Sequence, residues 1–377
     1  MFYWLFYEIL YHYYSPFRLF GYVTFRTALA SLTALAISIV LGPWLIARLR
    51  RFQIGQHIRE DGPATHFKKA GTPTMGGILI LISVVVPTLA FANLQNPHVW
   101  VALFGMLSFG AIGFWDDYLK VKHRRNLGLK ARHKLGLQLV ASLAVGALLL
   151  VLYAEGRYNT AMNVPFLKGF KPNLLIDAWL DHPYAYPLAF LFFFLFVALV
   201  LIGSANAVNL TDGLDGLAIG LMIIAAGAMT VLTYTSGHAV FANYLALVRM
   251  ADAAELTIFC GALTGASLGF LWYNAHPAEI FMGDVGSLAL GGALGVVAVL
   301  IKQEILLFFI GGIFVIEALS VILQVASFKL RGKRIFKMAP LHHHFEQIGW
   351  PESKIITRFW IAGLVMALFA LTTLKLR

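Results

Sequence analysis

The sequence predicts an all-α integral membrane protein of about ten transmembrane helices, forming a single polytopic domain over residues 1–377. Hydrophobic residues make up 59% of the chain, charged residues make up only 12%, and the mean hydropathy is +0.77. A water-soluble domain of this length cannot bury so much apolar surface. Much of the chain must therefore be surrounded by the hydrocarbon of a bilayer.

Ten apolar stretches are long enough to cross a bilayer as helices. They cover roughly residues 23–47, 75–95, 99–117, 134–154, 187–206, 213–234, 255–273, 286–301, 305–328 and 355–374. The eighth stretch is short. Residues 155–186, between the fourth and fifth stretches, contain Pro, Gly and Asn, and we expect a hairpin or a surface helix there.

The Lys and Arg residues divide the loops between two compartments. One side receives the loops at about 48–74, 118–133, 207–212, 274–285 and 329–354. These loops and their immediate flanks hold 19 of the 29 Lys and Arg residues, whereas the other side holds 9 and Arg358 lies just inside the last helix. The positive-inside rule makes the first side cytoplasmic, so both termini and the loop 155–186 are expected in the periplasm.

The net charge of +11 is thereby explained mostly by topology, and the basic clusters flank helix ends, which argues against a nucleic-acid partner. Cys260 is the single cysteine and lies in an apolar run, which excludes a disulfide framework and a cysteine-built metal site. The aromatic segment Met1–Phe25 lacks a compact apolar core and a cleavage site, so we expect it to be retained.

Adjacent carboxylates end the third stretch, at Asp116 and Asp117. Two like charges so close are costly unless a cation neutralises them, and aspartate oxygens suit a hard ion such as Mg²⁺. A plain solvated helix end beside Lys120 and Lys122 is the alternative. It is disfavoured because acidic groups at a helix C-terminus oppose the helix dipole.

Two further aspartate motifs follow on the same predicted face. The run Asn206–Gly216 contains two Asn, two Asp and a Thr, more polar groups than a helix cap requires. The run Phe281–Ser287 places Asp284 between glycines, which let the backbone approach a ligand while the carboxylate reaches a metal. A helix cap explains the second run about as well on its own, whereas the first run already favours function. Their convergence on one face favours a functional site.

Phosphate-binding features open the second stretch. Thr72 and Pro73 form an ordinary helix start, and Lys68 and Lys69 lie just before it. Cations and the free N–H groups of a helix N-terminus together attract phosphate. The second, sixth and eighth stretches all begin on the cytoplasmic side, an arrangement that suits a diphosphate.

Three consecutive histidines, His342, His343 and His344, lie in the basic loop 329–354. Consecutive residues cannot easily all turn to one metal ion, so a role as proton shuttle or phosphate partner fits better than zinc. Glu317 lies within the ninth stretch as an intramembrane acid without an assigned role.

Six segments of the chain, in order, closely resemble the phospho-N-acetylmuramoyl-pentapeptide transferase (MraY) family, within the polyprenyl-phosphate N-acetylhexosamine-1-phosphate transferases. They are Ile58–Pro63, Gly71–Gly77, Asp116–Asp117, Asn209–Gly216, Phe281–Ser287 and Pro340–Glu346. The resemblance runs from about Gln56 to the tenth stretch. The Thr-Pro-Thr-Met-Gly-Gly and Leu-His-His-His-Phe-Glu runs resemble the muramoyl-pentapeptide branch rather than its GlcNAc-phosphate sisters.

The resemblance implies a multi-pass enzyme of the bacterial inner membrane that acts in peptidoglycan synthesis. It implies transfer of phospho-MurNAc-pentapeptide from UDP-MurNAc-pentapeptide to undecaprenyl phosphate, giving lipid I and UMP. It also implies a Mg²⁺ requirement and a homodimer of ten-helix subunits. Such phosphoryl transfer needs positioning and charge stabilisation more than a strong protein nucleophile.

The resemblance also implies roles for individual residues. Asp284 would bind Mg²⁺, Asp116 and Asp117 would bind or deprotonate the lipid phosphate, and the three histidines would contact the diphosphate or sugar. The nucleotide pocket would be lined by Lys69, Thr74, Asn209, Asp212, Asp215, Asn274, Phe281 and Gln324. Direct attack by the lipid phosphate is preferred to a covalent aspartyl intermediate, although the sequence does not choose between them.

Other functions stay open at this point. The nearest alternative is a sister transferase that uses UDP-GlcNAc or another UDP-hexosamine. A secondary transporter would place its polar groups near the bilayer midplane within a two-fold internal repeat, and neither is evident here. A purely structural scaffold leaves the five aspartates unexplained.

Overall fold

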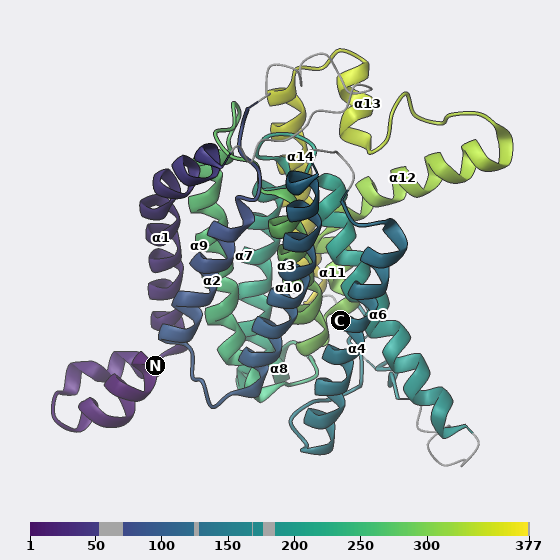
Figure 1. Cartoon of the computed structure of the whole chain (residues 1–377). Helices are drawn as coiled ribbons and strands as arrows, with labels where there is room; N and C mark the ends of the chain where they lie inside the picture. Colours follow the sequence, from purple (N-terminus) through teal and green to yellow (C-terminus); the bar gives the residue numbers. More distant parts are fainter. Residues whose placement is uncertain (53–70, 124–127, 168, 176–184, 376–377) are drawn as a thin grey trace.

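The structure is a computed structural model, and it describes residues 1–52, 71–123, 128–167, 169–175 and 185–375. These residues form a helical bundle (Figure 1), and they include an isolated antiparallel β-bridge between Ala161 and Asn173. The prediction of an all-α membrane protein is confirmed. The bridge lies in the 155–186 segment, where we expected a hairpin or a surface helix.

Each predicted span coincides with helical structure. The long helices are α1 (Val23–Arg51), α3 (Pro97–Lys122), α4 (Ala131–Ala154), α6 (Tyr186–Thr211), α7 (Leu217–Gly237), α9 (Leu256–Asn274), α10 (Gly283–Leu300), α12 (Gly312–Arg331) and α14 (Glu352–Thr373). Counting η5 as the first turn of α9, these nine helices of the described residues are long and apolar enough to cross a membrane. A tenth apolar helix, α2 (Gly77–Phe91), is shorter.

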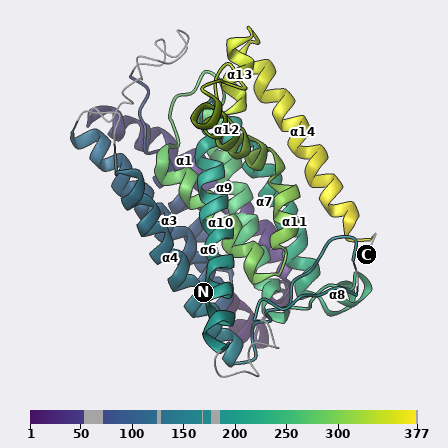
Figure 2. The same ribbon diagram turned by 90° about the vertical axis from the view of Figure 1, so that its right-hand side faces the viewer.

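Short elements join the long helices. They are η1 (Tyr3–Ile9), η2 (Leu10–His12), η3 (Ser15–Gly21), α8 (Ala239–Tyr244), η5 (Ala251–Glu255), α11 (Glu304–Ile310) and α13 (Leu341–Gln347). The histidine run forms α13, which follows α12 in the chain. Both lie at the end of the bundle where α1 finishes (Figures 1 and 2).

The predicted ninth span, 305–328, is wrong as a single continuous helix. It is divided at Gly311 into α11 and α12, and α12 projects sideways from the bundle (Figures 1 and 2). Hydropathy does not register this break, because Gly311 and Gly312 are counted as neutral residues in an apolar run. Two adjacent glycines, however, are poor helix formers and allow the chain to change direction.

Two predicted boundaries also move. The expected loop 207–212 is helical as far as Thr211, the last residue of α6, whose hydroxyl donates to the Ala207 carbonyl. The turn therefore lies between Thr211 and Leu217. The second span begins at Gly77 rather than residue 75, since Met75 has a left-handed φ of 69° that does not belong to a right-handed helix.

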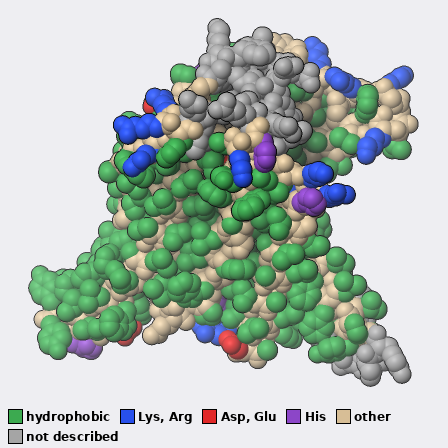
Figure 3. All heavy atoms as spheres, viewed as in Figure 1, with side chains coloured by type: hydrophobic (Ala, Val, Ile, Leu, Met, Phe, Trp, Pro, Cys, Tyr) green, Lys and Arg blue, Asp and Glu red, His purple; other side chains and the backbone are tan. Residues whose placement is uncertain are grey.

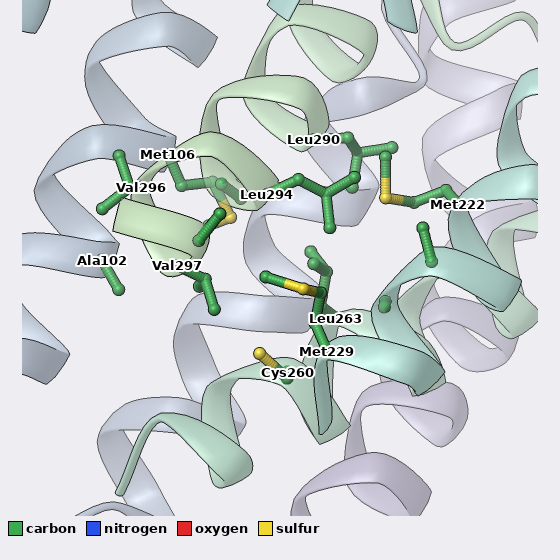
Figure 4. Packing of buried hydrophobic residues seen from close by; sticks show 14 of the residues in the cluster. Ala102, Met106, Met222, Met229, Cys260, Leu263, Leu290, Leu294, Val296 and Val297 are labelled. Carbon is green, nitrogen blue, oxygen red and sulfur yellow. The ribbon is translucent and has the colours of Figure 1, made fainter. Parts of the chain in front are cut away.

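The centre of the bundle is α10, which is buried from Val285 to Leu300. It packs against α3, α6 and α2. Figure 4 shows Val296 beside Met106 of α3, and Leu290 near Met222 of α7. A Cβ added at Gly105 of α3 would lie 2.4 Å from Val296 Cγ2, so the two helices approach closely. In lipid, such close packing of small residues replaces the hydrophobic effect as the main source of helix association.

Charge is distributed unevenly along the bundle axis. Figure 3 shows Lys and Arg side chains gathered at the end that carries α13, whereas a wide apolar band covers the middle. The two chain ends lie toward the opposite end of the bundle (Figure 1). This separation agrees with an even number of crossings.

We predict that the α13 end faces the cytoplasm. In a Cys260→Ser background, Glu155→Cys should react with an impermeant maleimide in intact cells and Gln347→Cys should react only after lysis. Both residues are exposed, they lie at opposite ends of the bundle, and neither change removes a positive charge. Labelling of Gln347→Cys in intact cells would reverse the orientation.

Candidate active site

Three carboxylates meet where α3 ends and α10 begins. Asp116 and Asp117 lie near the end of α3, and Asp284 lies in the first turn of α10. One oxygen from each of the three lies within 4.8 Å of the others. The structure thus brings together aspartates that are far apart in the sequence.

Two lysines neutralise part of this charge. Lys120 Nζ lies 2.6 Å from Asp116 Oδ2, 3.2 Å from Asp117 Oδ1 and 3.0 Å from Asp284 Oδ2. Lys134, in the first turn of α4, places its Nζ 2.6 Å from the same Asp284 oxygen. Three like charges could not share this space without such partners.

Backbone and amide donors fix each carboxylate. Asp117 Oδ2 accepts from the Val285 N–H at 3.1 Å, and Asp116 Oδ1 accepts from the Leu129 N–H at 2.8 Å. The amide of Asn209, near the end of α6, donates to Asp284 Oδ1 at 2.9 Å and to the Ser287 hydroxyl at 2.8 Å. The carboxylate positions are therefore set by α3, α6 and α10 together.

Glycines permit the close approach of these segments. Gly283 has a φ of 70°, and a Cβ there would lie 2.5 Å from Asp117 Oδ2 and 3.0 Å from Thr74 Oγ1. A Cβ at Gly113 of α3 would lie 2.0 Å from the Asp284 carbonyl oxygen. Neither position has room for a side chain, and Gly283 also adopts a conformation that favours glycine.

Asp212 caps the end of α6 beside this cluster. Desolvation, followed by the negative charges of Asp284, Asp117 and Asp215, raises the pKa of Asp212 to about 8. A neutral Asp212 can donate a hydrogen bond, which an ionised carboxylate cannot do. Thr74 lies near Gly283 on the other side of the cluster.

Asp215 belongs to a neighbouring polar group. Its Oδ2 accepts from the Ala278 N–H at 3.1 Å and lies 3.3 Å from His276 Nδ1, which is 3.5 Å from Glu352 Oε2. The buried Asn274 accepts from the Gly216 N–H at 3.0 Å and donates to the Ile280 carbonyl at 2.8 Å. Both predicted pocket residues therefore join the turn before α7 to the chain before α10.

The remaining predicted pocket residues do not gather at one place around the carboxylate cluster. Phe281 is half-buried, and its backbone pairs with Pro73 and Gly76. Gln324 of α12 accepts from the N–H groups of Ile335 and Phe336, so it holds the chain that follows α12. Lys69 and the segment Ile58–Pro63 lie outside the described residues.

The three histidines have different surroundings. His342 is buried, and its Nδ1 lies 3.1 Å from Glu317 Oε2. His343 Nδ1 lies 2.6 Å from Glu346 Oε2, and His344 Nδ1 accepts from the Lys337 N–H at 3.1 Å. His343 and His344 are partly exposed, whereas His342 is not.

Sequence reasoning assigned no site role to Lys120, Lys134, Ser287 or Glu317. Lys120 follows Asp116 by four residues and Asp117 by three, so helical spacing alone places all three on one face. Lys134 carries no such signal, because its partner Asp284 lies 150 residues away.

Two family models match the chain. A model described as Glycosyl transferase family 4 matches residues 99–302, and one described as phospho-N-acetylmuramoyl-pentapeptide-transferase signature 1 matches residues 69–81. The chain is thus a family 4 glycosyl transferase whose long apolar helices make it a membrane protein.

Full-length relatives define the family more narrowly. Proteins named phospho-N-acetylmuramoyl-pentapeptide-transferase are 68% identical in Solibacter usitatus, 65% in Koribacter versatilis and 66% in Acidobacterium capsulatum, each match covering 100% of both chains. The chain belongs to the phospho-N-acetylmuramoyl-pentapeptide transferase family.

The approach of α3 to α10 generates a stability prediction. Gly113→Ala should lower the thermal unfolding midpoint in detergent, because overpacking typically costs about 1–3 kcal/mol and the obstacle here is backbone. Gly136→Ala in α4 is the matched control, since a Cβ there meets nothing within 4 Å. An unchanged midpoint for Gly113→Ala would contradict the close approach.

Proposed function

We propose that this chain transfers phospho-MurNAc-pentapeptide from UDP-MurNAc-pentapeptide to undecaprenyl phosphate, giving lipid I and UMP. The observation that carries the proposal is the cluster of Asp116, Asp117 and Asp284 at a helix junction of a multi-pass membrane protein. Full-length relatives that carry the transferase name support the same reaction. The lipid acceptor explains the fold, because a polyprenyl tail stays in the bilayer while its phosphate reaches the site.

The carboxylate cluster fits a magnesium ion. Its donors are all oxygens, the type that Mg²⁺ prefers, and the Lys120 ammonium group already lies where the three carboxylates converge. Asp284 would hold the ion, with Asp116 and Asp117 close enough to assist. When bound, Mg²⁺ would supply positive charge that stabilises the phosphates during transfer.

The chain's own residues position the reactants. Asp116 and Asp117 each keep one oxygen on a backbone N–H, so their carboxylates are held in fixed orientations. This restraint supports a role in binding the acceptor. An oxygen of the lipid phosphate then attacks the phosphorus that bears the sugar, and the bridging P–O bond breaks with its electrons leaving on UMP.

The donor is recognised by residues around the cluster. Asn209, Asp212 and Thr74 surround the reacting centre, whereas Asp215 and Asn274 lie at the adjoining turn. We assign the nucleotide to this region, together with Phe281, Gln324 and Lys69. His343 and His344 would meet the sugar or its peptide. A homodimer is part of the proposal through the family relationship.

Removing the charge of Asp284 should abolish turnover. Asp284→Asn keeps the side-chain shape but loses the charge, so we expect at least about a 100-fold fall in kcat, since charge stabilisation by a metal is worth several kcal/mol. UMP release by purified enzyme measures this, and EDTA should stop the wild-type reaction until Mg²⁺ is added back. Asp252→Asn, an aspartate paired with Arg157 outside the site, is the control. Retention of most activity by Asp284→Asn would remove it from the metal site.

The donor itself is tested by exchanging the sugar. With Mg²⁺ and undecaprenyl phosphate, the enzyme should release UMP from UDP-MurNAc-pentapeptide and negligibly from UDP-GlcNAc, which lacks peptide carboxylates. Replacing His343 and His344 by Ala should reduce this turnover more than it weakens uridine binding, because the imidazoles lie beyond the nucleotide. A preference for UDP-GlcNAc would assign the chain to the sister-transferase reaction.

A further inference from the structure

A fully buried acid–imidazole pair lies outside the carboxylate cluster. Glu317 of α12 and His342 of α13 are both 0% exposed. Glu317 Oε1 accepts from the His342 backbone N–H at 3.2 Å, and Oε2 lies 3.1 Å from His342 Nδ1. One carboxylate thus holds both the backbone and the ring of a single residue. A carboxylate can only accept, so the ring carries its hydrogen on Nδ1.

The other ring nitrogen faces the turn that follows α6. His342 Nε2 is buried and has no hydrogen-bond partner in the structure. It lies against Gly213, where a Cβ would be only 2.2 Å from Nε2. Gly213 does not adopt a positive φ, so the contact rather than the backbone conformation requires glycine. The imidazole is therefore seated directly on the residue that follows Asp212.

We infer that Glu317 and His342 form a positioning dyad for the turn that carries Asp212. Glu317 fixes the ring, and the ring edge fixes Gly213. The position of this turn then sets the distance of Asp212 from Asp284 and Asp117, whose negative charges act on Asp212. This inference rests on the proposed function and assigns His342 an indirect role there, in place of the direct substrate contact expected from the sequence.

The chemistry of the pair agrees with a positioning role. Burying a carboxylate and an imidazole costs desolvation free energy, which a pair of apolar side chains would not cost. If the only role of the pair were packing, hydrophobic residues would therefore fill it equally well. Carboxylates that orient a metal-binding histidine are a common second layer of contacts, and their loss typically costs about 10- to 100-fold in metal affinity or activity, a range that we adopt for this pair. The dyad also connects α12, which projects from the bundle, to the reacting centre.

A double-mutant cycle tests the contact. Gly213→Ala should lower kcat by about 10- to 100-fold, the loss expected when such a supporting contact fails. In a His342→Asn background the same change should cost less than about threefold, because residues in contact show non-additive effects. Asn keeps a donor for Glu317 but removes the ring edge that a Cβ at residue 213 would meet. Gly227→Ala in α7, where a Cβ meets nothing within 4 Å, is the control.

A second measurement separates positioning from folding. Glu317→Gln should lower kcat while UMP affinity and the thermal midpoint stay near wild type, whereas a structural role would lower the midpoint and leave the kcat of the folded fraction unchanged. Wild-type turnover of UDP-MurNAc-pentapeptide tests the proposed function. The ratio of the variant's kcat to the wild-type kcat tests the dyad. If the wild type prefers UDP-GlcNAc, that donor is used for both. Additive effects of Gly213→Ala and His342→Asn, or full kcat in Glu317→Gln, would overturn the inference.

Discussion

The site depends on balancing three negative charges at one helix junction. Asp116, Asp117 and Asp284 repel one another, and at this separation they persist as a group only with cations between them. Lys120 comes from the same helix as two of the acids, whereas Lys134 must be brought by α4. The position of α4 against α3 is thus required by charge as well as by packing.

The same junction also requires α10 to pack closely against α3. Its first turn must reach the end of α3, and a Cβ at Gly113 would already collide with the Asp284 carbonyl. Lipid supplies no hydrophobic force between helices, so the approach must be secured by packing and hydrogen bonds. Gly105 of α3 allows close packing further along α10. Asn209 of α6 provides hydrogen bonds at the carboxylate cluster.

Much of this arrangement could be predicted from the sequence, because hydropathy locates helices and their parity assigns the aspartates to one face. The break at Gly311 could not, since glycine does not interrupt an apolar run. Nor could the partner of Asp284, because Lys134 is distant in the chain. The resemblance implies that all three histidines contact the diphosphate or sugar. Burial separates His342 from its neighbours, and a linear motif carries no information about burial.

The charge balance also bears on how an acidic site can accept a diphosphate. When all three acids are ionised, the carboxylates and the two ammonium groups leave one net negative charge. In the function we propose, a divalent cation bound there would reverse the sign and would attract phosphate. The lysines bring the cluster close enough to neutrality for a single ion to have this effect on a polyanionic donor.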